Sequence, residues 1–289
     1  MLKKRISANL VVKDGMVVQS MNFQKYLPIG KPAIAIEFLN QWGIDEIILL
    51  DISASSTNAG PNFGMIKEAS AKCYVPLTVG GGINSIEHVK ELMHCGADKI
   101  SLNQASLHNK NLISNTALTF GNQCVVVSID AIYSNGKYFV YDYLNKKPIA
   151  GLTALDHAKQ MEELGAGEIL INSVDRDGSY KGYDINLINE ICNVVTVPVI
   201  CCGGARNAAD LIEVFNTSNV SAASAGNFFH FTEHSVITTK SNVLEKHLLR
   251  LETHANYTAN PFNKEYRLLK KDDNELEEML FVAVKKEKI

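Results

Sequence analysis

The chain has 289 residues, of which 46% are hydrophobic and 20% charged, and its formal net charge is −3. This composition is typical of a globular protein with a buried core, and the weak negative charge argues against a nucleic-acid partner. No apolar run approaches the roughly 18 residues of a membrane span, and the basic first residues precede no apolar run of signal-peptide length. We therefore expect a cytoplasmic protein with neither a nucleic-acid nor a membrane partner.

The cysteines give no indication of a metal site. They are Cys73, Cys95, Cys124, Cys192, Cys201 and Cys202. None belongs to a Cys-x-x-Cys pair, and several lie in apolar runs that read as strands, so free thiols in a reducing compartment are expected. Because paired ligands at zinc spacing are missing, we expect no metal and no cofactor.

Short apolar runs alternate with amphipathic helical patterns along the chain. The predicted strands are residues 5–12, 45–51, 75–79, 98–102, 124–130, 167–174, 197–202 and 220–226. Helical patterns include residues 32–42, 85–95, 154–164 and 207–215, and Gly43, Gly96 and Gly165 follow three of them as C-cap glycines. Eight such units in about 250 residues favour an α/β fold of the (β/α)8 TIM-barrel type. An open, doubly wound sheet is the competing architecture.

The two halves of the chain resemble each other. The run "VPLTVGGG" at residues 75–82 returns as "VPVICCGG" at residues 197–204, and "IILLDISAS" with Asp51 matches "ILINSVDRDG" with Asp175. The offset of about 120 residues corresponds to half a barrel. The repeat therefore favours two half-barrels closed into a ring, and it pairs the strand of Val11 with the strand of Asp130.

Active sites of such barrels lie at the C-terminal ends of the strands. Glycine-rich strand ends at residues 80–82 and 203–204 let backbone N–H groups approach an anion, so two of them predict a ligand with two phosphates. The alternative is that these glycines only make tight turns. Asp130, at a strand end, is the candidate general acid or base, whereas Asp51 and Asp175 are candidates for structuring the loops.

Several motifs stand together at characteristic spacings: "VKDG", "DISASS", "PLTVGGGI", "GADKISLN", "SIDA", "GAGEILINSVDRDG", "KGYD" and "FFHF". Through them, residues 1–250 resemble the HisF family of histidine biosynthesis, the cyclase subunit of imidazole glycerol phosphate synthase. The resemblance implies a barrel that docks a HisH-like glutaminase subunit on its bottom face. Ammonia from the glutaminase would pass through the barrel and react at the top with a bis-phosphorylated ribulosyl formimino nucleotide.

The resemblance also assigns roles to residues. The expected phosphate and substrate contacts are Gly82, Asn103, Asp177, Gly178, Gly203, Gly204, Ala225 and Gly226. The expected ammonia gate is a ring of Arg5, Glu46, Lys99 and Glu168, for which the alternative is an ordinary salt-bridge floor. Asp98 and Gln123 match contacts with the glutaminase.

Two positions depart from the family pattern. The family uses two aspartates as acid and base, and of these Asp130 is kept whereas the strand 1 position is Val11. The position of a substrate-assisting lysine holds Gln19. Because valine transfers no proton, the leading hypothesis is a divergent ammonia-delivering subunit with a different acceptor. Members of a branch that forms acetamidino groups on bacterial surface sugars, with a separate sugar amidotransferase, resemble this chain in having an aliphatic residue at this position.

Two other hypotheses remain open, namely a working histidine-pathway cyclase and a non-catalytic scaffold that binds a phosphorylated ligand or a partner. Residues 1–252 are expected to form the barrel and residues 253–289 a C-terminal extension of unknown role. Within the barrel, Asn135 and Gly136 predict a hairpin over residues 133–143. The stretch "LEEMLFVAV" in the extension reads as a short helix or an added strand.

Overall fold

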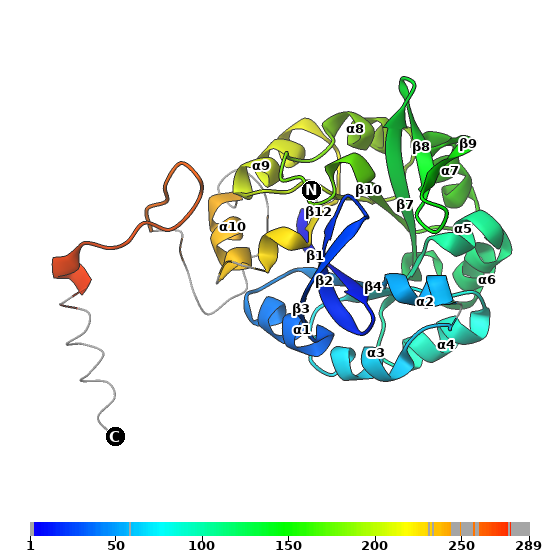
Figure 1. Cartoon of the computed structure of the whole chain (residues 1–289), viewed down its shortest axis with the longest axis horizontal. Helices are drawn as coiled ribbons and strands as arrows, with labels where there is room; N and C mark the ends of the chain where they lie inside the picture. The colour runs from blue at the N-terminus through cyan, green and yellow to red at the C-terminus, as the bar shows by residue number, and fades with distance from the viewer. Residues whose placement is uncertain are drawn as a thin grey trace.

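Eight parallel strands close into a barrel in the computed structural model, which describes residues 3–57, 59–230, 232, 234–243, 249, 257, 260–276 and 278 (Figure 1). The barrel strands are β1 (Arg5–Lys13), β4 (Glu46–Asp51), β5 (Leu77–Gly80), β6 (Lys99–Leu102), β7 (Val125–Ser134), β10 (Glu168–Ser173), β11 (Val199–Cys202) and β12 (Ala222–Ala225). Each pairs in parallel with its two neighbours, and the pairing of β7 with β10 completes the ring. The predicted TIM barrel is confirmed, and the open sheet was the wrong alternative.

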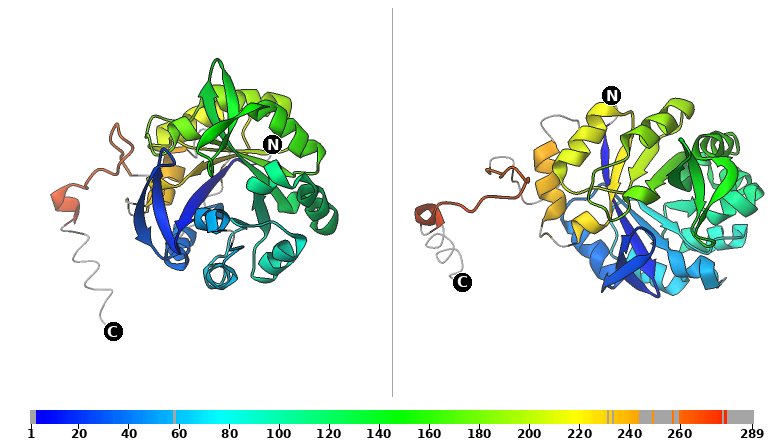
Figure 2. Two further views of the ribbon diagram at one scale, coloured as in Figure 1. Left: turned by 45° about the vertical axis from the view of Figure 1, so that its right-hand side comes forward. Right: turned by 45° about the horizontal axis from the view of Figure 1, so that its top comes forward.

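Helices follow the barrel strands and surround them (Figures 1 and 2). The longer ones are α1 (Pro32–Gln41), α3 (Phe63–Ser70), α4 (Ile86–His94), α6 (Lys110–Phe120), α7 (Ala154–Glu163), α8 (Ile185–Val194), α9 (Ala208–Thr217) and α10 (Ser235–Val243). Side chains of Ser85 and Thr153 accept the backbone N–H of His88 and Asp156, and so fix where α4 and α7 begin. Gly96 adopts a φ of 101° directly after the C-cap of α4, as its predicted capping role requires.

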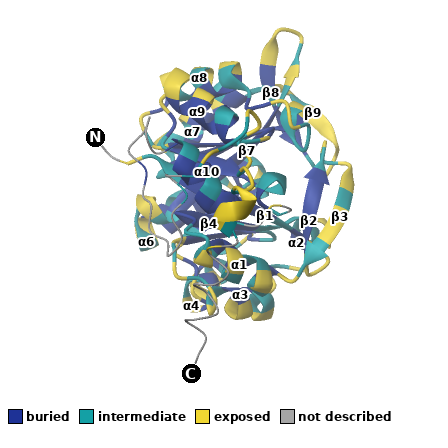
Figure 3. Cartoon of the chain, turned by 90° about the vertical axis from the view of Figure 1, so that its left-hand side faces the viewer, coloured by how far each residue is buried: buried dark blue, intermediate teal, exposed yellow. Residues whose placement is uncertain are grey.

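Each half of the barrel carries an antiparallel extension at the C-terminal end of its first strand. β7 continues into β8 (Lys137–Asp142) and β9 (Lys147–Thr153), and the predicted hairpin turn at Asn135 and Gly136 is confirmed by φ values of 48° and 80°. β1 likewise continues into β2 (Met16–Met21) and β3 (Lys25–Gly30). The sequence prediction missed this second extension, although Asp14 and Gly15 form the same kind of turn. Figure 3 shows both extensions on one side of the barrel.

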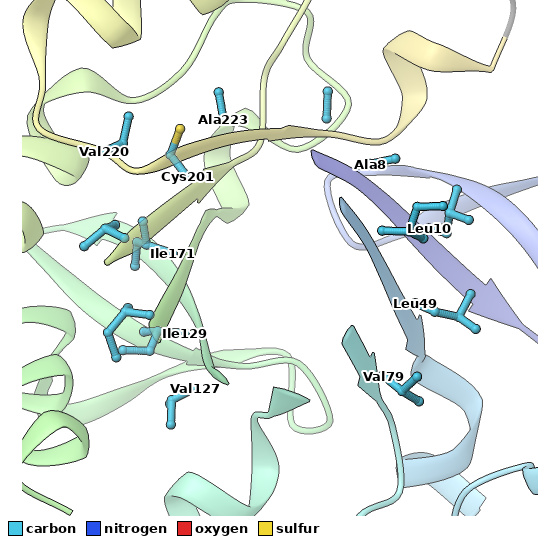
Figure 4. Close-up of a cluster of buried hydrophobic side chains, with 14 of the residues drawn as sticks. Ala8, Leu10, Leu49, Val79, Val127, Ile129, Ile171, Cys201, Val220 and Ala223 are labelled. Carbon is cyan, nitrogen blue, oxygen red and sulfur yellow. The ribbon is translucent and has the colours of Figure 1, made fainter. Parts of the chain in front are cut away.

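The core has two layers, because side chains of a strand point alternately to its two faces. Ile6, Leu10 and Val12 of β1 belong to the large cluster between strands and helices. Figure 4 shows part of this outer layer, including Leu10 and Leu49. A smaller apolar cluster lies on the inward faces of the strands, with members Ile48, Val126, Leu170, Ile200, Cys202 and Ala222. Since the alternation places Ile6 and Leu10 outside, Arg5, Ser7, Asn9 and Val11 face the interior.

The end of the chain is described only in part. Residues 262 and 268 form an isolated bridge, and residues 273–276 are helical. Most of "LEEMLFVAV", residues 276–284, lies outside the described residues, so the expectation for that stretch stays a prediction. In the part of the chain that the structure describes, no helix is long and apolar enough to cross a membrane.

A buried ion pair joins α10, which closes the ring of helices, to the barrel. Lys240 Nζ lies 2.5 Å from Asp45 Oδ1, and the two side chains are 1% and 5% exposed. Asp45 also accepts the backbone N–H of Ile6. Its carboxylate therefore links α10, β1 and the start of β4.

We expect Lys240→Met to lower the free energy of unfolding by about 3 kcal/mol, because it leaves a buried carboxylate without its cation. The measurement is urea unfolding at neutral pH. The exposed pair of Lys72 and Glu37, with side chains 49% and 43% exposed, provides the control, and Lys72→Met should change stability by less than about 0.5 kcal/mol. Equal small effects from both variants would contradict a stabilising role for the buried pair.

Candidate functional site

The expected site residues gather at the C-terminal mouth of the barrel. Two adjoining pockets open there and share Asn9, Val11, Ser20 and Asp177 in their lining. The first pocket adds Gly82, Asn103 and Asp130. The second adds Gly178, Gly203, Gly204, Ala225 and Gly226. The structure thus brings together at the mouth every residue that the sequence predicted as catalytic or as a phosphate and substrate contact.

Asp130 is the buried carboxylate of the mouth, only 6% exposed. Its Oδ2 accepts a hydrogen bond from Asn103 Nδ2 at 2.9 Å, and its Oδ1 accepts one from Asn172 Nδ2 at 3.2 Å. Burial raises the pKa of Asp130 to about 6, against the two amide hydrogen bonds, which lower it. A carboxyl with a pKa near neutrality is suited to take and return a proton.

Val11 lies across the barrel from Asp130. In the closed ring, β1 and β7 are separated by four steps in either direction, so they are diametrically opposed. Val11 is partly buried and lines both mouth pockets. Asp14, the nearest carboxylate in sequence, is exposed at the turn after β1. The mouth therefore has a carboxylate on β7 and an aliphatic side chain at the opposite position.

Gln19 and Tyr180 form an uncharged contact beside the second pocket. Gln19 Nε2 donates to the Tyr180 hydroxyl at 3.2 Å, and Gln19 is only 9% exposed. Tyr180 lines the pocket with a φ of 55° and is 40% exposed. Gln19 thus brings no positive charge to a place where the family resemblance predicts a lysine.

Asp177 anchors the β2–β3 extension over the mouth. Its Oδ2 accepts the Ser20 hydroxyl at 2.6 Å and the backbone N–H of Phe23 at 3.1 Å. Burial is the main effect on this carboxyl and raises its pKa, although both hydrogen bonds act in the opposite direction. Asn227 holds the same extension from the other side through both backbone groups of Ser20. Asp177 reaches both pockets, and its contact with a substrate stays a prediction.

The glycines of the mouth are required by close packing as well as by their backbone angles. A Cβ on Gly204 would lie 2.1 Å from the carbonyl oxygen of Gly182, and one on Gly178 would lie 2.4 Å from that of Ser20. At the other pocket, Gly82 adopts a φ of 68° and its N–H donates to Ser55 Oγ at 3.1 Å. Tight turns therefore account for these glycines by themselves, and phosphate binding at them stays a prediction.

The four charged residues of the predicted gate lie together at the opposite end of the barrel. Arg5 pairs with Glu46 at 2.6 Å and also with Glu168, while Lys99 pairs with Glu168 at 2.7 Å and lies 3.8 Å from Glu46. Burial of Glu46 raises the pKa of that carboxyl, although Arg5 lowers it. The ring is closed and formally neutral, so its geometry fits both a gate and a salt-bridge floor.

The two residues expected at the glutaminase interface lie at this same end. Asp98 directly precedes β6, is exposed and accepts the backbone N–H of Leu77 at 2.8 Å. Gln123 precedes β7 and is also exposed. Their surface is therefore accessible to a partner at the barrel bottom, and the contact itself stays a prediction.

The sequence analysis did not single out Asn172 as a site residue. Asn172 ends the inward face of β10 and is the second amide on Asp130. The position of Asn172 near the end of a predicted strand was the feature of the sequence that could have identified it as a site residue.

Asp51 and Asp175 were expected to structure loops, and they do: Asp51 accepts the backbone N–H of Ser53 and Asp175 that of Tyr133. Among the described residues, no group of three or more His, Cys, Asp or Glu could hold a metal ion.

We expect Asp130→Asn to stabilise the protein more at pH 8 than at pH 4.5, by a difference of about 2 kcal/mol. The pKa of this carboxyl is about 6 in the folded state and about 3.9 in an unfolded chain. The folded state therefore binds more protons between these values, and the free energy of unfolding falls as pH rises through them. Because asparagine does not titrate, Asp130→Asn removes this fall in the free energy of unfolding.

Urea unfolding of wild type and variant at both pH values measures this difference. The exposed Asp14→Asn provides the matched control for the loss of one carboxylate. An Asp130→Asn effect of equal size at both pH values would mean that the carboxyl does not change its protonation in this range.

Comparison with known proteins agrees with this geometry. Residues 5–235 match the family model described as "Histidine biosynthesis protein". The chain is 42% identical over 258 residues to the putative imidazole glycerol phosphate synthase subunit hisF2 of Vibrio vulnificus, covering 89% of this chain and 94% of that protein. It is 39% identical to subunit HisF of Methanopyrus kandleri, covering 85% and 97%, and 40% identical to subunit HisF of Clostridium botulinum, covering 85% and 98%.

The match with the family model spans the whole barrel up to the start of α10, and these relatives are aligned over nearly their full length. The chain therefore belongs to the histidine biosynthesis protein family, among the HisF-like relatives of imidazole glycerol phosphate synthase.

Proposed function

We propose that this chain is the synthase subunit of a two-protein glutamine amidotransferase. A HisH-like glutaminase would dock at the barrel bottom, beside Asp98 and Gln123, and release ammonia there. Ammonia would cross the barrel and react with a phosphorylated acceptor at the mouth. Asp130 would serve as the general acid or base of that reaction.

The inner wall of the barrel supports a path for a small polar molecule. The hydroxyls of Ser7 and Ser101 and the Oδ1 atoms of Asn9 and Asn172 are buried without a partner within the described part of the chain. Buried polar atoms normally have hydrogen-bond partners, and a small guest such as water or ammonia would provide them. These atoms lie on the inward faces of β1, β6 and β10. Asn9, Ser101 and Asn172 line the first mouth pocket, and Ser7 is the next inward-facing residue of β1 toward the charged ring.

We further propose that the acceptor differs from the ribulosyl formimino nucleotide of histidine biosynthesis. One observation carries this proposal. Val11, which cannot transfer a proton, lies opposite Asp130 at the mouth, whereas all four charged residues of the ring are present at the barrel bottom. Ammonia delivery needs the ring and the interior, whereas the cyclisation uses a second carboxylate that is missing. An acetamido group on a surface sugar, held by a separate sugar amidotransferase, is an acceptor that needs ammonia without this ring closure.

The second candidate function is that of the HisF relatives themselves, the formation of imidazole glycerol phosphate. Asp130, its pKa near neutrality and the pair of mouth pockets favour it. The names of the relatives favour it too. The two candidates differ in what Val11 and Gln19 do to the cyclisation, so one assay separates them.

We expect the purified protein to convert the ribulosyl formimino nucleotide at least about 100-fold more slowly than the variant Val11→Asp/Gln19→Lys, because a positioned acid or base typically contributes 10²–10⁴-fold. The assay uses ammonium salt at alkaline pH and follows substrate loss by absorbance, so no glutaminase is needed. Adding Asp130→Asn to the variant should abolish the gain. A wild-type turnover of about one per second, unchanged by the two substitutions, would assign the histidine-pathway reaction instead.

A further inference from the structure

A chain of buried and partly buried hydrogen bonds runs from α7 to the carboxylate of Asp130. It begins at His157 on α7 and passes through Ser106 on α5 (Gln104–His108) to Asn103, whose amide donates to Asp130. His157 and Ser106 are each only 1% exposed. Neither residue lines the mouth pockets, so neither can touch a substrate there.

Asn103 occupies the N-cap position of α5 but does not cap the helix with its side chain. An asparagine at an N-cap usually accepts a backbone N–H of the first turn. Here the amide nitrogen donates to Asp130 Oδ2 at 2.9 Å, and its oxygen faces Gln104 Nε2 at 3.4 Å. Because the Asn103 side chain is bonded to Asp130, it cannot cap α5, so another residue must stabilise the start of this helix.

Ser106 provides that support. Its hydroxyl and its backbone N–H both donate to the carbonyl oxygen of Asn103, at 2.6 and 2.9 Å. The hydroxyl hydrogen is used in this bond, so Ser106 Oγ accepts from His157 Nε2 at 2.9 Å. His157 Nδ1 has no partner among the described residues, as expected for a neutral ring that carries its proton on Nε2.

We propose that His157 is a positioning residue which, through Ser106, holds the Asn103 amide on Asp130 and so sets the proton affinity of that carboxyl. The relay bears on the proposed function because Asp130 is its acid or base. It requires no particular acceptor.

The surroundings of His157 make it a neutral donor. Burial lowers the pKa of His157 to about 4, and the ammonium of Lys110, which donates to Gln160 on α7, acts in the same direction. Replacing His157 therefore removes no charge at neutral pH. An effect on Asp130 would have to travel through the hydrogen bonds.

The second amide, from Asn172, and several titratable groups also face Asp130, and the substitutions leave all of them in place. The titratable groups are Asp177 on the loop after β10, Tyr26 on β3, Tyr141 on β8, Tyr143 after β8, and Cys202 on β11. A change in the pKa of Asp130 on substitution of His157 or Ser106 would thus report on the Asn103 amide.

The test is the pKa of Asp130, measured from the pH-dependent ¹³Cγ shift in aspartate-labelled protein and assigned by its loss in Asp130→Asn. His157→Phe and Ser106→Ala should each raise the pKa of Asp130 by roughly 1, because the carboxylate loses a well-placed donor. The double variant should show the same rise as either single variant, since both act in one chain of contacts. His157→Gln, whose amide can donate like Nε2–H, should restore the wild-type pKa.

Thr116→Val is the matched control, because Thr116 is also fully buried, lies on α6 and has a hydroxyl with no partner in the described part of the chain. It should leave the pKa of Asp130 unchanged. If His157→Phe and Ser106→Ala fold and leave the pKa of Asp130 unchanged, the relay is overturned. If His157→Phe does not fold, the result for Ser106→Ala decides. The titration uses no substrate, so failure of the relay is distinguishable from failure of the proposed function.

Discussion

The inward and outward alternation of side chains along β1 decides which of its residues face the interior of the barrel. Ile6, Leu10 and Val12 must face the helices, because the outer layer is the larger apolar cluster. Arg5 and Val11 are then forced to face the interior, one at each end. A shift of one residue in register would put an arginine among the helices and an apolar side chain in the charged ring. The apolar packing therefore fixes which residues can take part in chemistry.

At the barrel bottom, this constraint gathers two cations and two carboxylates in a small space. Glu46 and Glu168 are 2% and 5% exposed at their side chains, so each depends on Arg5 and Lys99 for compensation. Breaking such a pair leaves an uncompensated buried charge. The ring is thus stable when closed, and opening it as the proposed ammonia gate would need the charges to stay paired or to be met by the proposed glutaminase.

At the mouth, a carboxylate is buried without the compensating cations that surround the carboxylates of the ring. Among the residues that the structure describes, no cation pairs with Asp130 and two amides donate to its carboxylate, so the pKa stays near neutrality. The residue that supplies one amide, Asn103, is in turn held at its backbone carbonyl by Ser106, which contacts the buried His157. On the opposite side of the barrel, the side chain of Val11 can neither donate nor accept a proton. The mouth is therefore asymmetric in chemistry although the two halves of the fold match.

The sequence by itself determined the barrel, its eight strands and its repeat, because alternating apolar runs and capping residues are local signals. It also located the mouth, since the strand ends of a parallel barrel meet at one face. The family resemblance supplied the members of the ring, and their places at strand starts put them at the opposite face. The sequence prediction missed the β2–β3 extension and the role of Asn172. Only the tertiary structure decided that Asp177 is committed to holding Ser20 and that His157 reaches Asp130 through Ser106. These relations join residues far apart in the chain, and contacts of that kind depend on packing geometry that no local pattern encodes.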